Sequence, residues 1–448
     1  MTTLPDTALA RPRPASTALR PVLLYLAMAV LLVGTGVLMG WNYALTVINM
    51  GLISAIMALG VNLQWGFAGL FNIGIMGFLA LGGLGAVLVS MPPVADAWAA
   101  GGLRTLAGLA LGVLTVVAVV AVRGRMASGR AKTLAMIAVG VVGYLVTRAV
   151  LDPGVAAIEA VNSASTGYLG GMGLPVLLSW PVGGLLAAGA AWIIGKTALG
   201  LRSDYLAIAT LGIAEIILAV LKNEDWLARG VKNVIGVPSP VPQEIVLQRD
   251  PAFVARAAEF GLDPVSASTL WVKLLYLGLF AVVLLVLLTL AQLALKSPWG
   301  RMMRAIRDNE DAAEAMGKDV TRRHLQIFIL GSAICGVAGA MMVTLDGQLT
   351  PGSYTPLRYT FLIWVMVIVG GSGNNWGAVL GGFLIWWLWV IVEPLGNWLF
   401  GHIISVLPPG SGLAAHLHDA SAHMRLLTMG VVLLLVLRFS PRGLLPER

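Results

Sequence analysis

The chain has 448 residues, of which 58% are hydrophobic and 11% charged, and its formal net charge is +8. Soluble domains carry about 25% charged residues, so the composition excludes a soluble enzyme. Long apolar runs exclude an outer-membrane barrel built from short alternating segments. Basic residues in a membrane protein mostly mark its cytoplasmic loops, so the positive charge does not predict a nucleic-acid partner. We expect an all-α polytopic membrane protein surrounded by membrane lipid.

The N-terminal residues 1–20 are predicted to form a basic cytoplasmic arm, in which Arg11, Arg13 and Arg20 stand among prolines. Residues 21–448 are predicted to form one membrane domain. A helix needs about 20 residues to cross the hydrocarbon core, and uncharged runs of that kind predict about 10–12 transmembrane or broken helices. The runs lie near 21–40, 42–63, 67–91, 103–122, 133–151, 174–195, 205–221, 270–295, 325–345, 359–373, 376–392 and 424–438.

Loops and breaks follow from glycine, proline and charge. The glycines and asparagines of 370–375 divide the last long apolar stretch into two shorter helices, and broken helices often line a transport pathway. Residues 222–269 and 393–423 are rich in proline and are predicted to be extracytoplasmic loops, the first with one short helix around 251–260. Lys and Arg gather in the alternate loops, which places the longest loop, 296–324, and both termini in the cytoplasm.

No catalytic residue and no metal site is predicted. Cys335 is the single cysteine, and His416 and His418 at i, i+2 do not share a helix face. A phosphate-binding loop needs a glycine five residues before its Gly-Lys-Thr, whereas Ala190 stands there ahead of residues 195–197. The chain is therefore not expected to be an enzyme or to hydrolyse ATP, and no cofactor is expected in it.

The cytoplasmic loop contains one predicted helix, residues 308–317. Asp308 can cap its start, and Gly317 can end it in a left-handed conformation. Such a helix is too short to be stable alone, so it needs a surface to dock against. Its small apolar patch is formed by Ala312, Ala313 and Met316, beside Glu310 and Glu314.

The cytoplasmic loop and four other segments resemble a known family. Glu314-Ala315, preceded by Ala312-Ala313 and followed by Gly317, resembles the EAA-type cytoplasmic loop of bacterial ABC importer permeases. Several blocks in the right order resemble the LivM-type permease subunit of the branched-chain amino-acid uptake family. They are SPWGRMMRAIRDNEDAAEAMG (297–317), ALGVNLQWGFAGLFNIG (58–74), SDYLAIATLGIAEII (203–217), GGSGNNWGAVLGG (370–382) and RFSPRGL (438–444).

The resemblance implies an importer in the bacterial plasma (inner) membrane. Its partners would be a second, LivH-like permease subunit, two cytoplasmic ATPase subunits that hold ATP and Mg, and an extracytoplasmic solute-binding protein. We expect the short helix to couple this chain to an ATPase subunit. The residues assigned to ATPase coupling are Arg307, Asp308, Glu310, Ala312, Ala313, Glu314, Met316 and Gly317.

Pathway candidates are polar side chains within apolar or glycine-rich segments. A carboxylate embedded in the membrane needs a partner, water or protonation, so Glu215 is a candidate for gating or helix packing. Uncharged polar residues can contact the solute, although hydrogen bonding between helices is the commoner role. The uncharged candidates are Asn49, Asn62, Gln64, Asn72 and Asn374.

The leading hypothesis is a permease subunit of an importer for branched-chain or related hydrophobic amino acids. A urea or short-chain amide importer is the alternative within the same machinery. An ion-coupled secondary transporter is the alternative from another class, but its helices would carry more ionisable residues for coupling. The segment 96–170 is longer than the corresponding part of the family's usual core, and residues 398–423 are expected to be an added external loop.

Overall fold

A computed structural model describes residues 16–162, 166–201, 203–407 and 423–447, together with residues 412 and 417. Arg11, Arg13, His416 and His418 lie outside the described residues. Within these ranges nine helices are long and apolar enough to cross a membrane, and the apolar helices Ile75–Ser90 and Leu357–Gly370 are shorter. Each predicted apolar run contains a helix, so the prediction of an all-α polytopic membrane protein is confirmed.

The chain packs as two compact units. Unit 1 draws on residues 1–69, 242–318 and 362–448, and unit 2 on residues 70–241 and 319–361. The chain passes from one unit to the other four times, at points inside or beside its helices. A division of this kind leaves no linker, which is why the composition does not reveal it.

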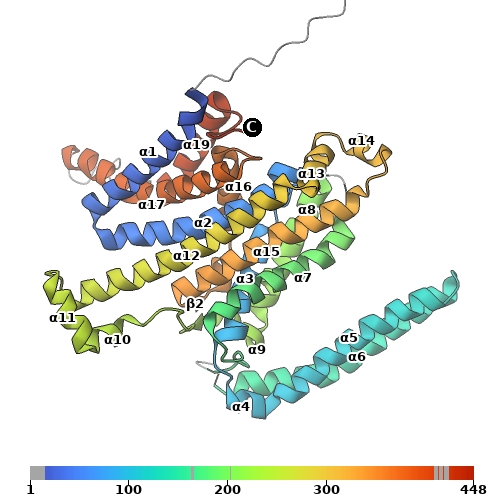
Figure 1. Ribbon diagram of the computed structural model, residues 1–448. Coiled ribbons are helices and arrows are strands. Elements are labelled where there is room, and N and C mark those ends of the chain that lie inside the picture. Colours follow the sequence, from blue (N-terminus) through green and yellow to red (C-terminus); the bar gives the residue numbers. More distant parts are fainter. Residues whose placement is uncertain are drawn as a thin grey trace, which may run out of the picture. The chain divides into compact units, whose positions relative to one another are not determined.

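Unit 1 is organised around α2 (Trp41–Ala68), which is largely buried and apolar on all its faces. It packs against α12 and α17, and α12 runs beside it in both ribbon views (Figure 1). Gly382 of α17 permits the close approach, since a Cβ there would lie 2.6 Å from the Cα of Ala55. The other described helices of unit 1 are α1 (Ser16–Met39), α10 (Glu244–Arg249), α11 (Pro251–Glu259), α12 (Pro264–Lys296), α13 (Pro298–Asp308), α14 (Glu310–Ala315), α16 (Leu362–Gly370), α17 (Asn375–Val406) and α19 (Met424–Phe439).

Unit 2 has a three-helix centre of α3 (Ile75–Ser90), α7 (Ser179–Ala198) and α15 (Val320–Asp346). A Cβ on Gly82 would lie 1.9 Å from the carbonyl oxygen of Gly336, so α3 and α15 touch backbone to backbone. A two-stranded antiparallel sheet joins β1 (Val234–Ile235) to β2 (Gln348–Leu349), with Val234 opposite Leu349. The remaining elements are α4 (Ala95–Ala97), η1 (Trp98–Gly102), α5 (Leu103–Arg125), α6 (Arg130–Ala160), η2 (Val176–Leu178), α8 (Ser203–Asn223), α9 (Asp225–Ala228), η3 (Gly230–Lys232), η4 (Pro351–Ser353) and η5 (Leu357–Phe361).

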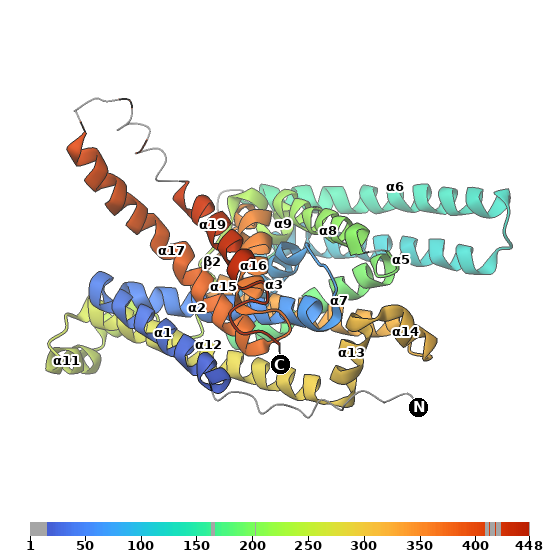
Figure 2. The same cartoon turned by 90° about the horizontal axis from the view of Figure 1, so that it is seen from above.

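Residues 96–170, the segment that is long for the family, contain a long helical hairpin in unit 2. Helices α5 and α6 lie side by side and antiparallel (Figure 2). Their most apolar 18-residue windows have mean hydropathies of 2.5 and 2.0, yet only 11% and 0% of the residues in these windows are buried. Both helices therefore present apolar side chains on most of their surface, as lipid-facing helices do.

Three predicted boundaries are wrong. Helix α1 begins at Ser16, inside the predicted arm. Helix α17 continues through Pro394 to Val406, because apolar and helix-compatible residues follow the proline, so the predicted loop at 393–423 begins with helix. Helix α3 begins only at Ile75, after a turn at Gly69 that ends α2 in the left-handed conformation with φ 69°. The short helix predicted around 251–260 is confirmed as α11.

Candidate functional site

The predicted cytoplasmic loop at 296–324 is mostly helical. Helix α13 follows α12 after Ser297 and starts with Pro298 at its first position, where the missing N–H costs nothing. Gly300, Met303 and Ile306 are buried, and their spacing of three puts them on one face of the helix. Sequence reasoning missed α13, although this apolar spacing was present in the sequence.

Helix α14 is capped at both ends. The Asn309 side chain accepts a hydrogen bond from the backbone N–H of Ala312 at 2.9 Å. The predicted cap at Asp308 is therefore wrong: Asp308 is the last residue of α13, and its carboxylate pairs with Arg307. Gly317 has φ 75° and its N–H donates to the carbonyl of Glu314 at 2.8 Å, so the predicted left-handed end is confirmed.

Helix α14 is exposed except at Ala313. None of its residues is buried, and Met316, which follows it, is 79% exposed. Glu310, Ala312 and Glu314 are exposed as well, and Ala313 is half-buried. A six-residue helix gains little stability by itself, so its two caps and its connection to α13 hold it. The assignment of these residues to ATPase coupling stays a prediction.

Arg307 makes contacts away from α14. Its Nη1 donates to the carbonyl oxygen of Gly66 in the last turns of α2, and the same nitrogen lies 2.8 Å from Glu447 Oε2. Its Nη2 lies 3.0 Å from Asp308 Oδ1. Partial burial lowers the pKa of the Arg307 guanidinium, but the hydrogen bonds and charges of Glu447 and Asp308 outweigh that effect, so the pKa is raised above its ordinary value.

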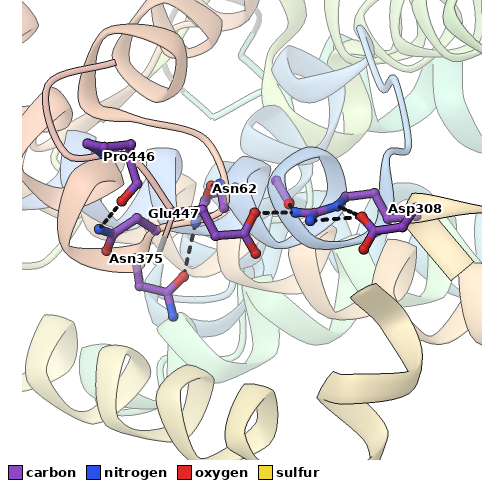
Figure 3. Close-up of polar contacts among 9 residues, drawn as sticks. Asn62, Asp308, Asn375, Pro446 and Glu447 are labelled. Carbon is purple, nitrogen blue, oxygen red and sulfur yellow. Dashed lines mark hydrogen bonds and ion pairs between the residues drawn. The ribbon is translucent and has the colours of Figure 1, made fainter. Parts of the chain in front are cut away.

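Asn62 ties α2 to the break between α16 and α17 (Figure 3). Its Oδ1 accepts from the backbone N–H of Gly373 at 2.9 Å, and its Nδ2 donates to Asn375 Oδ1 at 3.0 Å. Asn62 and Asn375 are 0% and 2% exposed. Asn374 caps α17 by accepting from the backbone N–H of Trp376 at 3.1 Å. Both predicted pathway residues of this region therefore hold the broken helix in place.

The C-terminal tail, residues 443–447, completes the cluster. The N–H groups of Leu444 and Leu445 donate to the carbonyls of Val369 and Gly370 at 2.8 and 2.9 Å, which satisfies acceptors at the end of α16 that lack helical partners. Leu445 is 4% exposed, and Asn374 Nδ2 donates to the Pro446 carbonyl at 3.3 Å. We call Arg307, Gly66, Asn62, residues 371–375 and this tail the Arg307 cluster.

The other pathway candidates lie outside the Arg307 cluster. Asn49 is buried and its Nδ2 donates to the Lys273 carbonyl at 3.0 Å, joining α2 to α12. Gln64 is buried near the end of α2. In unit 2, buried Asn72 accepts from the N–H of Gly74 at 2.9 Å in the turn before α3.

Glu215 lies on a face of α8 that the rest of the chain does not cover, and its role in gating or helix packing stays a prediction. It is exposed on α8, whereas the buried face of that helix carries Thr210, Ala214 and Leu218. Successive helical residues are about 100° apart around the axis, so the residue after Ala214 turns away from that face.

Glu447, Gly66 and Asn375 were not among the predicted site residues. The resemblance at 438–444 and the glycine-rich break marked the two segments that meet, but nothing in the sequence pairs them. Residues 66, 307, 373 and 447 are brought together only by the packing of four separate chain segments. Long-range contacts of this kind carry no periodic signal.

Residues 126–437 of the chain match the family described as branched-chain amino acid transport system / permease component. It is 31% identical over 238 residues to the high-affinity branched-chain amino acid transport system permease protein LivM of Escherichia coli (strain K12), covering 52% of this chain and 54% of that protein.

Two archaeal proteins are also similar. The probable branched-chain amino acid transport permease protein LivM of Methanocaldococcus jannaschii is 28% identical over 251 residues, with 55% of this chain and 61% of that protein covered. The probable LivH permease protein of the same organism is 30% identical over 182 residues, with 41% and 50% covered. The chain thus spans about half the length of the curated relatives it matches. No solved structure matches it significantly.

These matches confirm the LivM-type resemblance and agree with a multi-pass membrane protein that is a transport component. They favour neither the urea or amide importer nor the ion-coupled secondary transporter. They assign no role to the residues of α14 or of the Arg307 cluster.

Proposed function

We propose that this chain, which belongs to the family of permease components of branched-chain amino acid transport systems, is the transmembrane subunit of an ATP-driven importer for branched-chain or related hydrophobic amino acids. It would lie in a bacterial plasma membrane with both termini in the cytoplasm. Its partners would be a second, LivH-like permease subunit, two ATPase subunits and an extracytoplasmic solute-binding protein.

The observation that carries the proposal is the exposed, doubly capped helix α14. Asn309 and Gly317 define its ends, and none of its residues is fully buried against the chain. Helices this short are stable when they dock on a partner. Its apolar residues Ala312 and Met316 suit an apolar groove, and the neighbouring acidic residues suit a basic rim around that groove.

In this proposal the chain provides the transport pathway and a partner subunit hydrolyses ATP. The sequence has no phosphate-binding loop, so the energy for uphill uptake would come from a partner that binds ATP and Mg. Helices α12 and α15 flank the segment that carries α14. Movement of α14 with an ATPase subunit would therefore pull directly on two long apolar helices.

The test begins with assembly. The chain is coexpressed with candidate ATPase subunits and the second permease subunit, and the complex is purified through a tag on this chain. Met316→Asp should weaken assembly by about tenfold or more, because an unpaired carboxylate in an apolar contact costs several kcal/mol. Purified complexes are then reconstituted with the binding protein, and uptake of leucine is compared with uptake of urea.

Met126→Asp is the matched control. Met126 is also an exposed methionine, 38% exposed, and lies in the turn between α5 and α6. It should leave assembly unchanged. Equal assembly of wild type and Met316→Asp would contradict the docking role of α14. Leucine uptake without any ATPase subunit would contradict the proposed function.

A further inference from the structure

The C-terminal tail is bound to unit 1 by several different interactions. Two backbone hydrogen bonds join it to the end of α16, Leu445 packs with Met28 and Leu380, and the carbonyl of Pro446 accepts from Asn374. Gly371 has φ 118°, and a Cβ on it would lie 2.3 Å from the carbonyl oxygen of Leu445. The tail therefore fits against the break between α16 and α17 at close range.

Glu447 lies at the end of this bound tail and faces the helix that leads into α14. Its carboxylate contacts Arg307 at 2.8 Å, and a Cβ on Gly373 would lie 2.7 Å from the same carboxylate. Arg307 is the second-last residue of α13, and α14 starts three residues later at Glu310. The ion pair is thus adjacent to the predicted docking helix on one side and to the broken helix on the other.

The guanidinium of Arg307 joins three segments at once. It has five N–H donors in a rigid plane, whereas a lysine ammonium is a point charge that cannot reproduce the same set of contacts. One nitrogen serves both the Gly66 carbonyl and Glu447, and the other edge pairs with Asp308. Arg307 therefore connects α13 with α2 and with the C-terminal tail.

A continuous series of contacts leads from Arg307 to the break between α16 and α17. Gly66 lies one helical turn after Asn62 on α2. Asn62 in turn holds the backbone of Gly373 and the side chain of Asn375. Because Asn62 and Asn375 are both buried, their hydrogen bonds are costly to break. A displacement of α13 would therefore act on a rigid set of groups.

We propose that Arg307 and Glu447 are positioning residues that link movement of α14 to α2 and to the break between α16 and α17, with the C-terminal tail as a structural part of that link. This inference rests on the proposed function, because it assumes that α14 docks on an ATPase subunit. It assigns the tail a role in coupling ATP hydrolysis to uptake, in addition to any role in folding.

The ion pair of Arg307 and Glu447 is partly exposed, so its loss should affect coupling more than the stability of the fold. The side chains of Arg307 and Glu447 are 23% and 30% exposed, and ion pairs open to solvent contribute little to folding. The tail also keeps its backbone hydrogen bonds and buried Leu445 when the carboxylate is removed. Glu447→Gln should therefore fold, insert and assemble like the wild type.

The experiment uses the complete reconstituted complex with its ATPase subunits and binding protein. Leucine uptake and ATP hydrolysis are measured on the same vesicles for wild type, Glu447→Gln, Arg307→Lys and the double variant. We expect each single variant to raise the ATP hydrolysed per leucine by about fivefold or more, the lower end of ordinary coupling effects. The double variant should be little worse than either single variant, since both remove one interaction.

Arg442→Gln is the matched control, because Arg442 is an exposed basic residue of the same C-terminal segment and lies just before the tail. It should leave the ratio of ATP to leucine unchanged, and Glu447→Asp should restore part of the coupling. An unchanged ratio in Glu447→Gln, or additive effects in the double variant, would overturn the inference. A wild-type chain that fails to assemble with any ATPase subunit would instead overturn the proposed function.

Discussion

Gly66→Ala tests whether the Arg307 cluster is packed as closely as described. A Cβ at this position would lie 2.3 Å from Asn62 Oδ1 and 2.4 Å from the backbone nitrogen of Gly373. The asparagine side chain can rotate, but the Gly373 backbone is fixed by its own left-handed conformation at φ 80°. The methyl group must therefore displace the turn or break the hydrogen bond between Asn62 and Gly373.

The expected change in the free energy of unfolding on Gly66→Ala is the sum of three contributions. Overpacking costs about 1–3 kcal/mol, and the lost hydrogen bond costs about 1 kcal/mol. Replacing a glycine inside a helix returns about 0.5–1 kcal/mol. The net result is a loss of about 1–3.5 kcal/mol in the free energy of unfolding.

Thermal unfolding of the detergent-solubilised chain, followed by tryptophan fluorescence, provides the measurement. Gly189→Ala in α7 is the control, because nothing lies within 4 Å of a Cβ at that helical glycine. The control should melt at the wild-type temperature or slightly above it, and Gly66→Ala should melt below it. If Gly66→Ala melts with or above the control, the close packing of α2 against the turn at 373 is refuted.

Two further changes test the ends of helices. Gly317→Val forces a β-branched residue into φ 75° and should reduce leucine uptake and ATPase assembly. Gly261→Val imposes the same strain at φ 67° after α11 and should preserve assembly. Equal assembly of the two variants would contradict the role of α14. Asp263 caps α12 by accepting from the backbone N–H of Ser266 at 3.0 Å, which lowers the pKa of its carboxyl. A lowered pKa stabilises the fold above the unfolded pKa and loses that contribution as the pH falls through the folded value. Asp263→Ala should therefore lower the melting temperature at pH 7, and the difference from wild type should shrink on acidification; a difference that is constant with pH would exclude the cap as its cause.

Apolar composition predicted the helices because it acts locally and over long segments. Every uncharged run contains a helix, and the glycine–asparagine break at 370–375 separates α16 from α17. The end of α14 was predicted equally well, since Gly317 takes a conformation that other residues avoid. Its start was not, because Asp308 and Asn309 are both good caps, and α13 extends through Asp308, which leaves Asn309 as the residue before α14.

The candidate site was predicted only in part for a different reason. Arg307, Asn62 and Asn374 have the chemistry expected of site residues, but the tail that contacts Arg307 and Asn374 comes from a segment without hydrophobic periodicity. Glu215 was selected because it is acidic in an apolar run, and it proved exposed because a run of this kind does not indicate which face is buried. Sequence thus predicted which residues could act and did not predict which of them meet.

The α5–α6 hairpin shows how charge and length together locate a segment in the bilayer. In α5 the uncharged stretch between Arg104 and Arg123 is about 27 Å long, close to the thickness of the hydrocarbon core. In α6 the corresponding stretch, residues 133–147, is about 22 Å long. It ends at Arg148, whose Nε lies 2.9 Å from Asp152.

That ion pair neutralises its two charges within one helix, so they can lie at the membrane boundary without a partner chain. The basic turn that joins the helices then belongs at the opposite boundary, which the distribution of Lys and Arg predicts to be the cytoplasmic one. The two helices can therefore cross the bilayer as a pair, with lipid covering the apolar side chains that the rest of the chain leaves exposed.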